Sequence, residues 1–317
     1  MTLIDLHSHF VTPSYVEAAR AAGHEHPDGM PGWPDWDPAR QLDLMDACGI
    51  ATSVLSISSP GTHFGDDASA RALSREVNDV GAGLRADHPG RFGHLASLPL
   101  PDVDGALVEA AYALDDLGSD GVTVETNAHG RYLGDPAFAP LWSELDHRGA
   151  VVFVHPTSPA VAGPELAALT AGRPRPMLEF VFDTARTYAD LALTGTLARF
   201  PGIRWIATHG GGALPLLADR IELFRTAFGD GGRDPVTDQL SALWFDTAGT
   251  PFPHQVPTLE RTLGIERLVY GSDSCWTPAP AVHAQVASLD AAPPASDGRS
   301  WRELTTANAR RLLGSSR

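Results

Sequence analysis

The sequence predicts a (β/α)8 TIM barrel in which residues 1–317 form one domain, with a metal site at the C-terminal ends of the strands. Short apolar runs typical of strands alternate with amphipathic stretches typical of helices along the whole chain, which indicates a parallel α/β fold. Eight such pairs fit a closed barrel better than an open, doubly wound sheet. The length of 317 residues also suits a barrel of about 250 residues that carries insertions.

The elements follow in order from this alternation. The expected strands lie near residues 3–8, 52–58, 92–98, 121–126, 150–155, 203–209, 243–248 and 268–273. The expected helices lie near residues 39–48, 66–87, 103–117, 137–148, 177–199, 213–228, 255–263 and 279–290, with a final amphipathic helix near 301–313. Several strands pass directly from an apolar run to a polar residue, as in VVFVHP, IRWIATHGGG and LVYGSD.

Two expected loops are long. Residues 23–38, after the first strand, are rich in glycine, proline, tryptophan and histidine, and residues 156–176, after the fifth strand, contain five prolines. Loops that follow the strands of a barrel lie at its C-terminal mouth, so we expect both segments to roof an active site. The alternative for each is a surface insertion or a subunit contact.

The composition excludes several classes of function. A formal net charge of −16 argues against nucleic acid or an anionic membrane surface as a partner, since both require clustered arginine and lysine. No apolar run approaches the roughly 18 residues that span a bilayer, and the start of the chain lacks the features of a signal peptide, so we expect a cytoplasmic protein. The 23 basic residues are all arginine, which excludes chemistry that needs lysine, including a metal bridge built on a carboxylated lysine. A metal centre should therefore hold a single ion.

Histidines and an aspartate stand where four of the expected strands end. His7 and His9 share one face of the first strand, because side chains two residues apart in a strand point the same way. Imidazole nitrogens bind zinc and similar ions, so this pair suits one metal. His155, His209 and Asp273 directly follow the fifth, sixth and eighth runs. A single histidine of this kind is more often structural, but a barrel brings all these strand ends to one face, and their convergence predicts a metal centre.

Several motifs, in order along the chain, resemble the decarboxylase branch of the metal-dependent amidohydrolase superfamily. They are DLHSHF, WDPARQLDLMDACGI, FVHP, ARFPGIRWIATHGGGALPLLADRI, LVYGSD and TTANARRLLG. This branch includes aminocarboxymuconate semialdehyde, γ-resorcylate and 6-methylsalicylate decarboxylases. The segment LEFVFDTARTYADLALTG resembles the 6-methylsalicylate enzymes in particular.

The resemblance implies a role for each candidate residue. His7, His9, His155 and Asp273 would ligate one divalent ion, zinc first and manganese as the alternative. His209 would stand beside the metal as an acid-base or supporting residue, and Asp273 would also take part in catalysis. The family implies a homodimer or homotetramer.

Arg220 follows His209 by eleven residues, a spacing that resembles the arginine with which the aminocarboxymuconate enzyme binds a substrate carboxylate. A guanidinium suits that task, although a structural salt bridge is the alternative. A second arginine of that enzyme has no counterpart here, because Gln41 or Asp43 takes its place. This departure favours a substrate with one carboxylate.

Further side chains should face the mouth of the barrel. Glu125 and Asn127 end the fourth strand and Asp246 ends the seventh, and Glu125 is a candidate hydrogen-bond acceptor for a ligand histidine. Aromatic residues that could wall a substrate pocket, or instead belong to the core, are Trp33, Trp36, Phe180, Phe182, Phe252 and Trp276.

The sequence thus predicts a metal-dependent, non-oxidative decarboxylase of a hydroxylated aromatic acid, of the salicylate or 6-methylsalicylate type. The metal would bind the carboxylate and the adjacent phenol oxygen, while Asp273, or a water molecule at the metal assisted by His209, would protonate the ring carbon. The first alternative is a hydrolase of a lactone or amide, because the same metal site can activate water. The second is a metal-binding barrel without catalytic activity.

Overall fold

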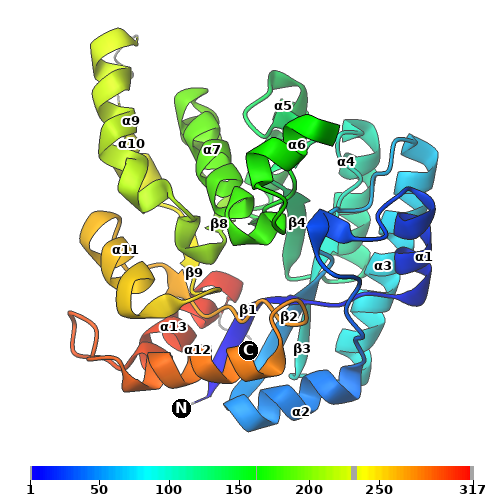
Figure 1. The fold of residues 1–317 in the computed structure, drawn as a ribbon, viewed down its shortest axis with the longest axis horizontal. Coiled ribbons are helices and arrows are strands. Elements are labelled where there is room, and N and C mark those ends of the chain that lie inside the picture. Colours follow the sequence, from blue (N-terminus) through cyan, green and yellow to red (C-terminus); the bar gives the residue numbers. More distant parts are fainter. Residues whose placement is uncertain (1, 162, 230–233, 315–317) are drawn as a thin grey trace.

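The computed structural model describes residues 2–161, 163–229 and 234–314. Eight parallel strands form one sheet with helices around it (Figure 1). In sheet order they are β1 (Leu3–His9), β2 (Ile50–Ser56), β3 (Phe92–Ser97), β4 (Gly121–Glu125), β7 (Val151–His155), β8 (Arg204–Ala207), β9 (Trp244–Asp246) and β10 (Leu268–Val269). Parallel bridges from Asp5 to Tyr270 and from Ser8 to Ser274 join the last segment to the first. The predicted barrel is confirmed.

Helices lie where the sequence pattern predicts them, with one change. They are α2 (Pro38–Cys48), α3 (Asp67–Asp87), α4 (Val103–Ala111), α5 (Ala139–His147), α7 (Glu179–Leu193), α9 (Leu214–Phe228), α11 (Val256–Thr262), α12 (Ala279–Ala291) and α13 (Trp301–Leu313). The helix expected over 177–199 is interrupted, because Gly195 adopts a left-handed backbone with φ of 75° and separates α7 from α8 (Thr196–Arg199). None of the described helices has the length and apolarity needed to cross a bilayer.

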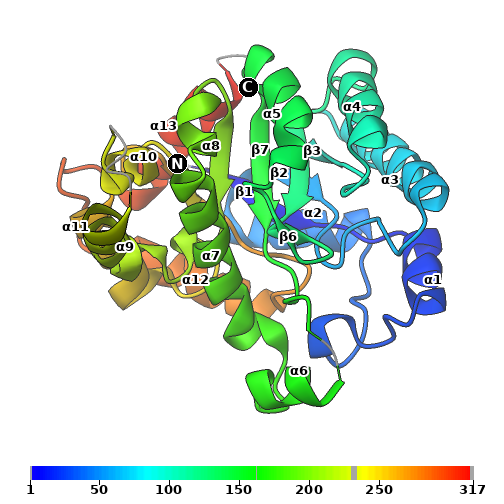
Figure 2. The ribbon, with the colours of Figure 1, turned by 90° about the horizontal axis from the view of Figure 1, so that it is seen from above.

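Other short elements had not been predicted. Helix α1 (Pro13–Ala21) follows β1, and its start carries a recognisable signal, since Thr12 caps the first turn and Pro13 occupies its first position. Helix α6 (Gly163–Thr170) lies inside the second long loop and projects away from the barrel in Figure 2. Helix α10 (Val236–Ser241) precedes β9, and a small hairpin, β5 (Asn127–Ala128) with β6 (Arg131–Tyr132), follows β4.

Apolar side chains fill the interior of the barrel and set the level of its mouth. The interior cluster takes residues from seven of the eight strands, including Ile4, Leu6, Phe153 and Ile206, all buried. Along β7, Val151 and Phe153 belong to this cluster, so the alternation of a strand also directs His155 inward, one step nearer the C-terminal end. The ring of Phe153 lies 4.9 Å from that of His7 and forms the floor beneath the polar residues.

Candidate active site

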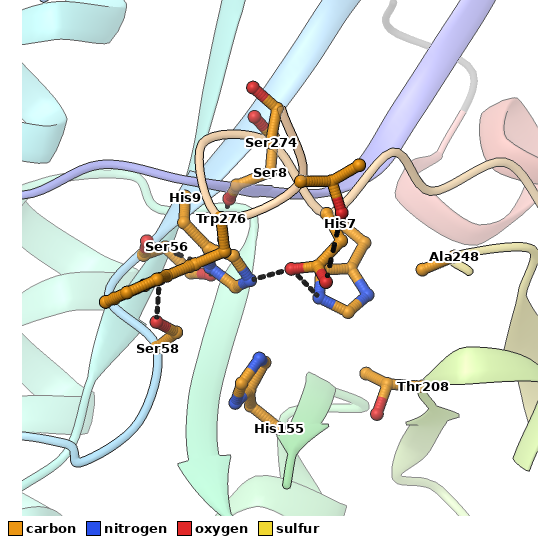
Figure 3. Close-up of polar contacts among 12 residues, drawn as sticks. His7, Ser8, His9, Ser56, Ser58, His155, Thr208, Ala248, Ser274 and Trp276 are labelled. Carbon is orange, nitrogen blue, oxygen red and sulfur yellow. Dashed lines mark hydrogen bonds and ion pairs between the residues drawn. The ribbon is translucent and has the colours of Figure 1, made fainter. Parts of the chain in front are cut away.

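Four potential metal ligands meet at the C-terminal end of the barrel. One ligand atom from each of His7, His9, His155 and Asp273 lies within 4.8 Å of all the others. The three histidines are buried and Asp273 is partly buried. Figure 3 shows the rings of His7, His9 and His155 directed into one common space.

A local irregularity in β1 brings both of its histidines inward. Regular alternation from Ile4 and Leu6, which face the interior, would direct His7 outward. The pairing of β1 with β2 shifts between Asp5 and Ser8, so His7 joins His9 at the centre, with their ring centroids 4.8 Å apart. The predicted pair is therefore present, although it depends on a departure from the regular strand.

The chemistry of these residues fits one divalent cation. The Nε2 atoms of His7 and His9 are buried and have no hydrogen-bond partner among the described residues, although they lie 3.4 and 3.3 Å from Oδ1 of Asp273. Buried nitrogens without a partner are costly, and a metal ion is one group that would satisfy them. Three imidazoles with one carboxylate are a ligand set of the kind that zinc and related ions take.

Hydrogen bonds on the far side of the rings orient the two histidines of β1. Nδ1 of His7 lies 2.7 Å from Oδ2 of Asp246, and Nδ1 of His9 lies 3.0 Å from Oγ of Ser56. Both contacts turn Nε2 toward the cluster, which is how carboxylates and hydroxyls commonly support a metal-binding imidazole. The sequence predicts Asp246 at the mouth of the barrel, but it does not predict the hydrogen bond between Asp246 and His7.

A buried amide joins the two segments that carry potential metal ligands. Gln41 of α2 donates from Nε2 to Oγ of Ser8, 3.2 Å away, and its Oε1 accepts a hydrogen bond of 2.8 Å from Oγ of Ser274. Ser8 stands between His7 and His9, and Ser274 follows Asp273. Gln41 thus holds β1 against the loop after β10.

The two carboxylates create a strong preference for positive charge at the centre. Burial opposes a charged imidazole, yet Asp246 and Asp273 outweigh it and raise the pKa of His7 to about 10. Burial lowers the pKa of His9 and of His155, which favours the neutral form of both rings. Burial acts to raise the pKa of Asp273, but its contacts with His209, His7 and His9 hold that pKa well below its usual range.

Glu125 comes near His155 without a hydrogen bond. Its Oε2 lies 3.6 Å from Nδ1 of His155, beyond hydrogen-bond length, and has no other partner in the described part of the chain. Burial, with the nearby Asp28, raises the pKa of Glu125 well above its usual range. Asn127 instead donates to Asp183 of α7 and has a structural role.

His209 stands beside the cluster at the end of β8. Its Nε2 lies 3.5 Å from Oδ2 of Asp273, and its buried Nδ1 has no partner among the described residues. The turn that holds it needs glycine at Gly212, where φ is 59° and a Cβ would lie 2.2 Å from the carbonyl oxygen of Val181. His209 is therefore held next to the carboxylate of Asp273.

A small cavity of about 250 Å³ opens onto these groups. His155, His209 and Asp273 form its polar end, and Phe180 and Trp276 form aromatic walls. The remaining lining residues are Asp28, Met30, Ser58, Ser59, Pro176, Gly249, Thr277 and Pro278. Both long loops thus contribute to the cavity. Of the other aromatic candidates, Phe182 is 46% exposed, and Trp33, Trp36 and Phe252 pack against the core.

The family model described as amidohydrolase matches residues 4–315 of this sequence. The chain belongs to the amidohydrolase family. The predicted family is therefore confirmed. This amidohydrolase is 37% identical over 305 residues to Decarboxylase yanB of Aspergillus niger, an alignment that covers 92% of the chain and 82% of the relative. It is 36% identical over 283 residues to 6-methylsalicylic acid decarboxylase acuB of Aspergillus aculeatus, covering 85% of the chain and 83% of that relative.

Solved structures share the fold of the amidohydrolase along its full length. The crystal structure of amidohydrolase II, a structural-genomics target, has a TM-score of 0.91 and 35% identity, covering 98% of this chain and 99% of the other. Dihydroxybenzoic acid decarboxylase from Polaromonas, solved with bound manganese and the inhibitor 2-nitroresorcinol, has a TM-score of 0.83 and 22% identity, covering 100% and 98%. At 22% identity, the similarity to the Polaromonas enzyme shows a shared fold and nothing further.

Arg220 lies away from the cavity within a single chain of the amidohydrolase. It belongs to α9 and lines a separate hollow of about 930 Å³ between α7 and α9, with its guanidinium carbon 4.7 Å from the centre of the Phe224 ring. That hollow is not lined by His155, His209 or Asp273. The role of Arg220 in binding a substrate carboxylate stays a prediction.

Proposed function

We propose that this amidohydrolase is a metal-dependent, non-oxidative decarboxylase that converts a hydroxylated aromatic carboxylic acid into carbon dioxide and a phenol. The observation that carries the proposal is the cluster of His7, His9, His155 and Asp273 at the end of a small, aromatic-walled cavity. A volume of about 250 Å³ is below the range of about 300–1,000 Å³ typical of sites for drug-sized ligands, which suits an acid with one ring. The relatives named decarboxylases support the same reaction.

In this proposal the four residues of the cluster hold one divalent ion. When bound, the ion supplies a positive charge that attracts and polarises the carboxylate and the adjacent phenol oxygen of the substrate. Phe180 and Trp276 flank the ring and limit the access of water. The indole of Trp276 is itself fixed by a hydrogen bond of 2.7 Å from Nε1 to Oγ of Ser58 (Figure 3).

Asp273 and His209 carry the proton in the proposed reaction. Either a water molecule assisted by His209, or Asp273 after it has itself taken up a proton, protonates the ring carbon that bears the carboxylate. The ring loses its aromaticity, and the oxygen of the ortho hydroxyl stabilises the positive charge that forms. Cleavage of the bond between the ring and the carboxylate returns an electron pair to the ring, which restores aromaticity and releases carbon dioxide.

We propose zinc as the bound ion, with manganese as the alternative. A set of three imidazoles and one carboxylate favours zinc, and manganese is the ion bound in the Polaromonas structure of the same fold. Elemental analysis of the purified protein, followed by activity measurements after stripping and reloading with each metal, distinguishes the two ions.

The proposed substrate is of the salicylate or 6-methylsalicylate type, in accord with the name of the Aspergillus aculeatus relative. The test is a panel of salicylate, 6-methylsalicylate, 2,4- and 2,6-dihydroxybenzoate and aminocarboxymuconate semialdehyde, with carbon dioxide and the organic product identified by mass spectrometry. We expect one of the hydroxybenzoates to give carbon dioxide and the matching phenol. Turnover of lactones or amides instead, with incorporation of water and without carbon dioxide, would favour the hydrolase alternative.

We also propose that the protein forms a homodimer or homotetramer. Helices α7 and α9 expose large apolar side chains, among them Leu193, Leu216, Leu223 and Phe228, the last two being 62% and 81% exposed in a single chain. Exposed apolar patches of this kind mark protein interfaces, and identical chains most often pair with two-fold symmetry. Light scattering after size exclusion tests this, and Leu223→Glu with Phe228→Glu should yield monomers. The cytoplasmic location stays a prediction.

A further inference from the structure

Asp28 is a buried carboxylate in the wall of the proposed substrate cavity. It comes from the first long loop, is 7% exposed, and lines both the cavity of about 250 Å³ at the cluster and an adjoining chamber of about 540 Å³. The acid-base and metal chemistry described above does not use it. Burying a carboxylate is costly unless the group is paired and hydrogen-bonded.

The backbone and side chain of Asp28 are both held in place. Its φ of 53° and ψ of 24° lie in the left-handed region, which aspartate and asparagine tolerate better than most residues. Oδ1 of Asp28 accepts a hydrogen bond from Oγ of Ser158, and this Oγ in turn accepts one of 2.8 Å from Nε of Arg175. Ser158 and Arg175 belong to the second long loop, so the two loops meet at Asp28.

The other oxygen of Asp28 is available to a ligand. No hydrogen bond joins Oδ2 to another residue in the described part of the chain. Among the described residues that line the smaller cavity, Asp28 carries the one acidic or basic side chain apart from His155, His209 and Asp273. A carboxylate can only accept hydrogen bonds, and it repels a second negative charge.

We propose that Asp28 determines substrate specificity by accepting a hydrogen bond from a second ring hydroxyl and by rejecting a second carboxylate. The inference rests on the proposed function and, among acids of the salicylate type, favours those whose ring carries a second hydroxyl group over salicylate itself. The hydroxyl beside the carboxylate belongs to the polar end of the cavity, and the second hydroxyl points to Oδ2 of Asp28. The negative charge of Asp28 would repel a second carboxylate on the substrate. This repulsion adds a second reason, beside the arginine that is missing near Gln41, to expect a substrate with one carboxylate.

The variant Asp28→Asn tests this with little change in shape. Asparagine tolerates the left-handed backbone and keeps an oxygen for Ser158, but it replaces the free acceptor by an NH2 donor and removes the charge. A hydrogen bond to a charged group corresponds to about a 10- to 100-fold change in affinity. We therefore expect KM for the preferred dihydroxybenzoate to rise by about that factor, while KM for salicylate stays nearly the same. A ring dicarboxylate such as 4-hydroxyisophthalate should bind better to the variant.

Asp35→Asn is the matched control. Asp35 lies in the same loop and loses the same charge, but its side chain is 83% exposed and does not line the cavity. The substrate preference of the Asp35→Asn variant should equal that of the natural protein. An equal change in both variants would mean that net charge, and not the contact at Asp28, sets the preference, and would overturn the inference.

A binding measurement separates this inference from the proposed function. Calorimetry with the metal-loaded natural protein should show resorcinol binding about tenfold more tightly than phenol, and the difference should disappear in Asp28→Asn. Equal affinities for the two phenols in the natural protein would overturn the role of Asp28, even if the protein releases carbon dioxide from salicylate. Conversely, tighter resorcinol binding without decarboxylation of any acid would support Asp28 and contradict the reaction.

Discussion

The carboxylate of Asp246 forms hydrogen bonds with the ring of His7 and with the backbone N–H of His209, the residue that we propose for proton transfer. Its Oδ2 lies 2.7 Å from Nδ1 of His7, while its Oδ1 accepts a hydrogen bond of 2.7 Å from the backbone N–H of His209. One buried side chain at the end of β9 thus contacts a proposed ligand of β1 and the turn after β8. The same side chain therefore positions both the proposed metal site and the proposed acid-base residue.

Replacement of Asp246 should weaken metal binding without removing a ligand. In Asp246→Asn the imidazole of His7 loses its charged acceptor, and loss of such a supporting contact typically costs about 10- to 100-fold in metal affinity. Competition with a chelator of known affinity measures the effect. The exposed carboxylate of Asp238 on α10 offers a control, since Asp238→Asn should leave the affinity unchanged. An unchanged affinity in Asp246→Asn would show that Asp246 is dispensable for the metal site.

Metal binding should release a proton from His7 and strengthen as the pH rises. The pKa of His7 is raised to about 10, so the ring is protonated in the metal-free protein at neutral pH and must lose a proton to bind an ion. His9 and His155 have lowered pKa values and contribute no further proton. We expect release of about one proton per ion and an affinity that rises about tenfold per pH unit between about pH 7 and 9. Calorimetric titration in buffers of different ionisation enthalpy gives the number of protons released per ion. Release of no proton would contradict the claim that His7 is protonated in the metal-free protein.

His209 should affect turnover far more than metal content. Removal of a positioned acid or base typically lowers the rate by about 10²- to 10⁴-fold, so His209→Asn should lose most of its kcat while still binding one ion per chain. Steady-state kinetics combined with elemental analysis makes the distinction. A parallel loss of metal would instead make His209 part of the metal site.

Arg220 provides a test of the predicted carboxylate contact. If this guanidinium binds the substrate carboxylate, Arg220→Ala should raise KM strongly, by about 10-fold or more, while metal content stays near one ion per chain. An unchanged KM would assign Arg220 a structural role beside Phe224, where its guanidinium now lies.

The barrel and its convergent residues could be predicted because they depend on local patterns. Apolar runs followed by His155 or Asp273 are visible in the sequence, and a barrel brings such strand ends together wherever they occur along the chain. Helix α1 was also within reach, because the cap at Thr12 and the proline after it are local signals.

The parts that escaped prediction depend on tertiary contacts. The shift in β1 that turns His7 inward is set by pairing with β2, and the contact of Asp246 with His7 joins positions 239 residues apart in sequence. Asp28 gains its place from a left-handed turn and from Ser158 in another loop. No periodicity in the sequence encodes these relationships.

The most direct test of the central claim is the release of carbon dioxide from hydroxybenzoates by one preparation in three states: metal-loaded, stripped with chelator, and reloaded. The account predicts release in the first and third states only, with neither metal nor activity in His7→Ala or Asp273→Ala. Full turnover by the stripped protein or by either variant would contradict a decarboxylase that acts through this cluster.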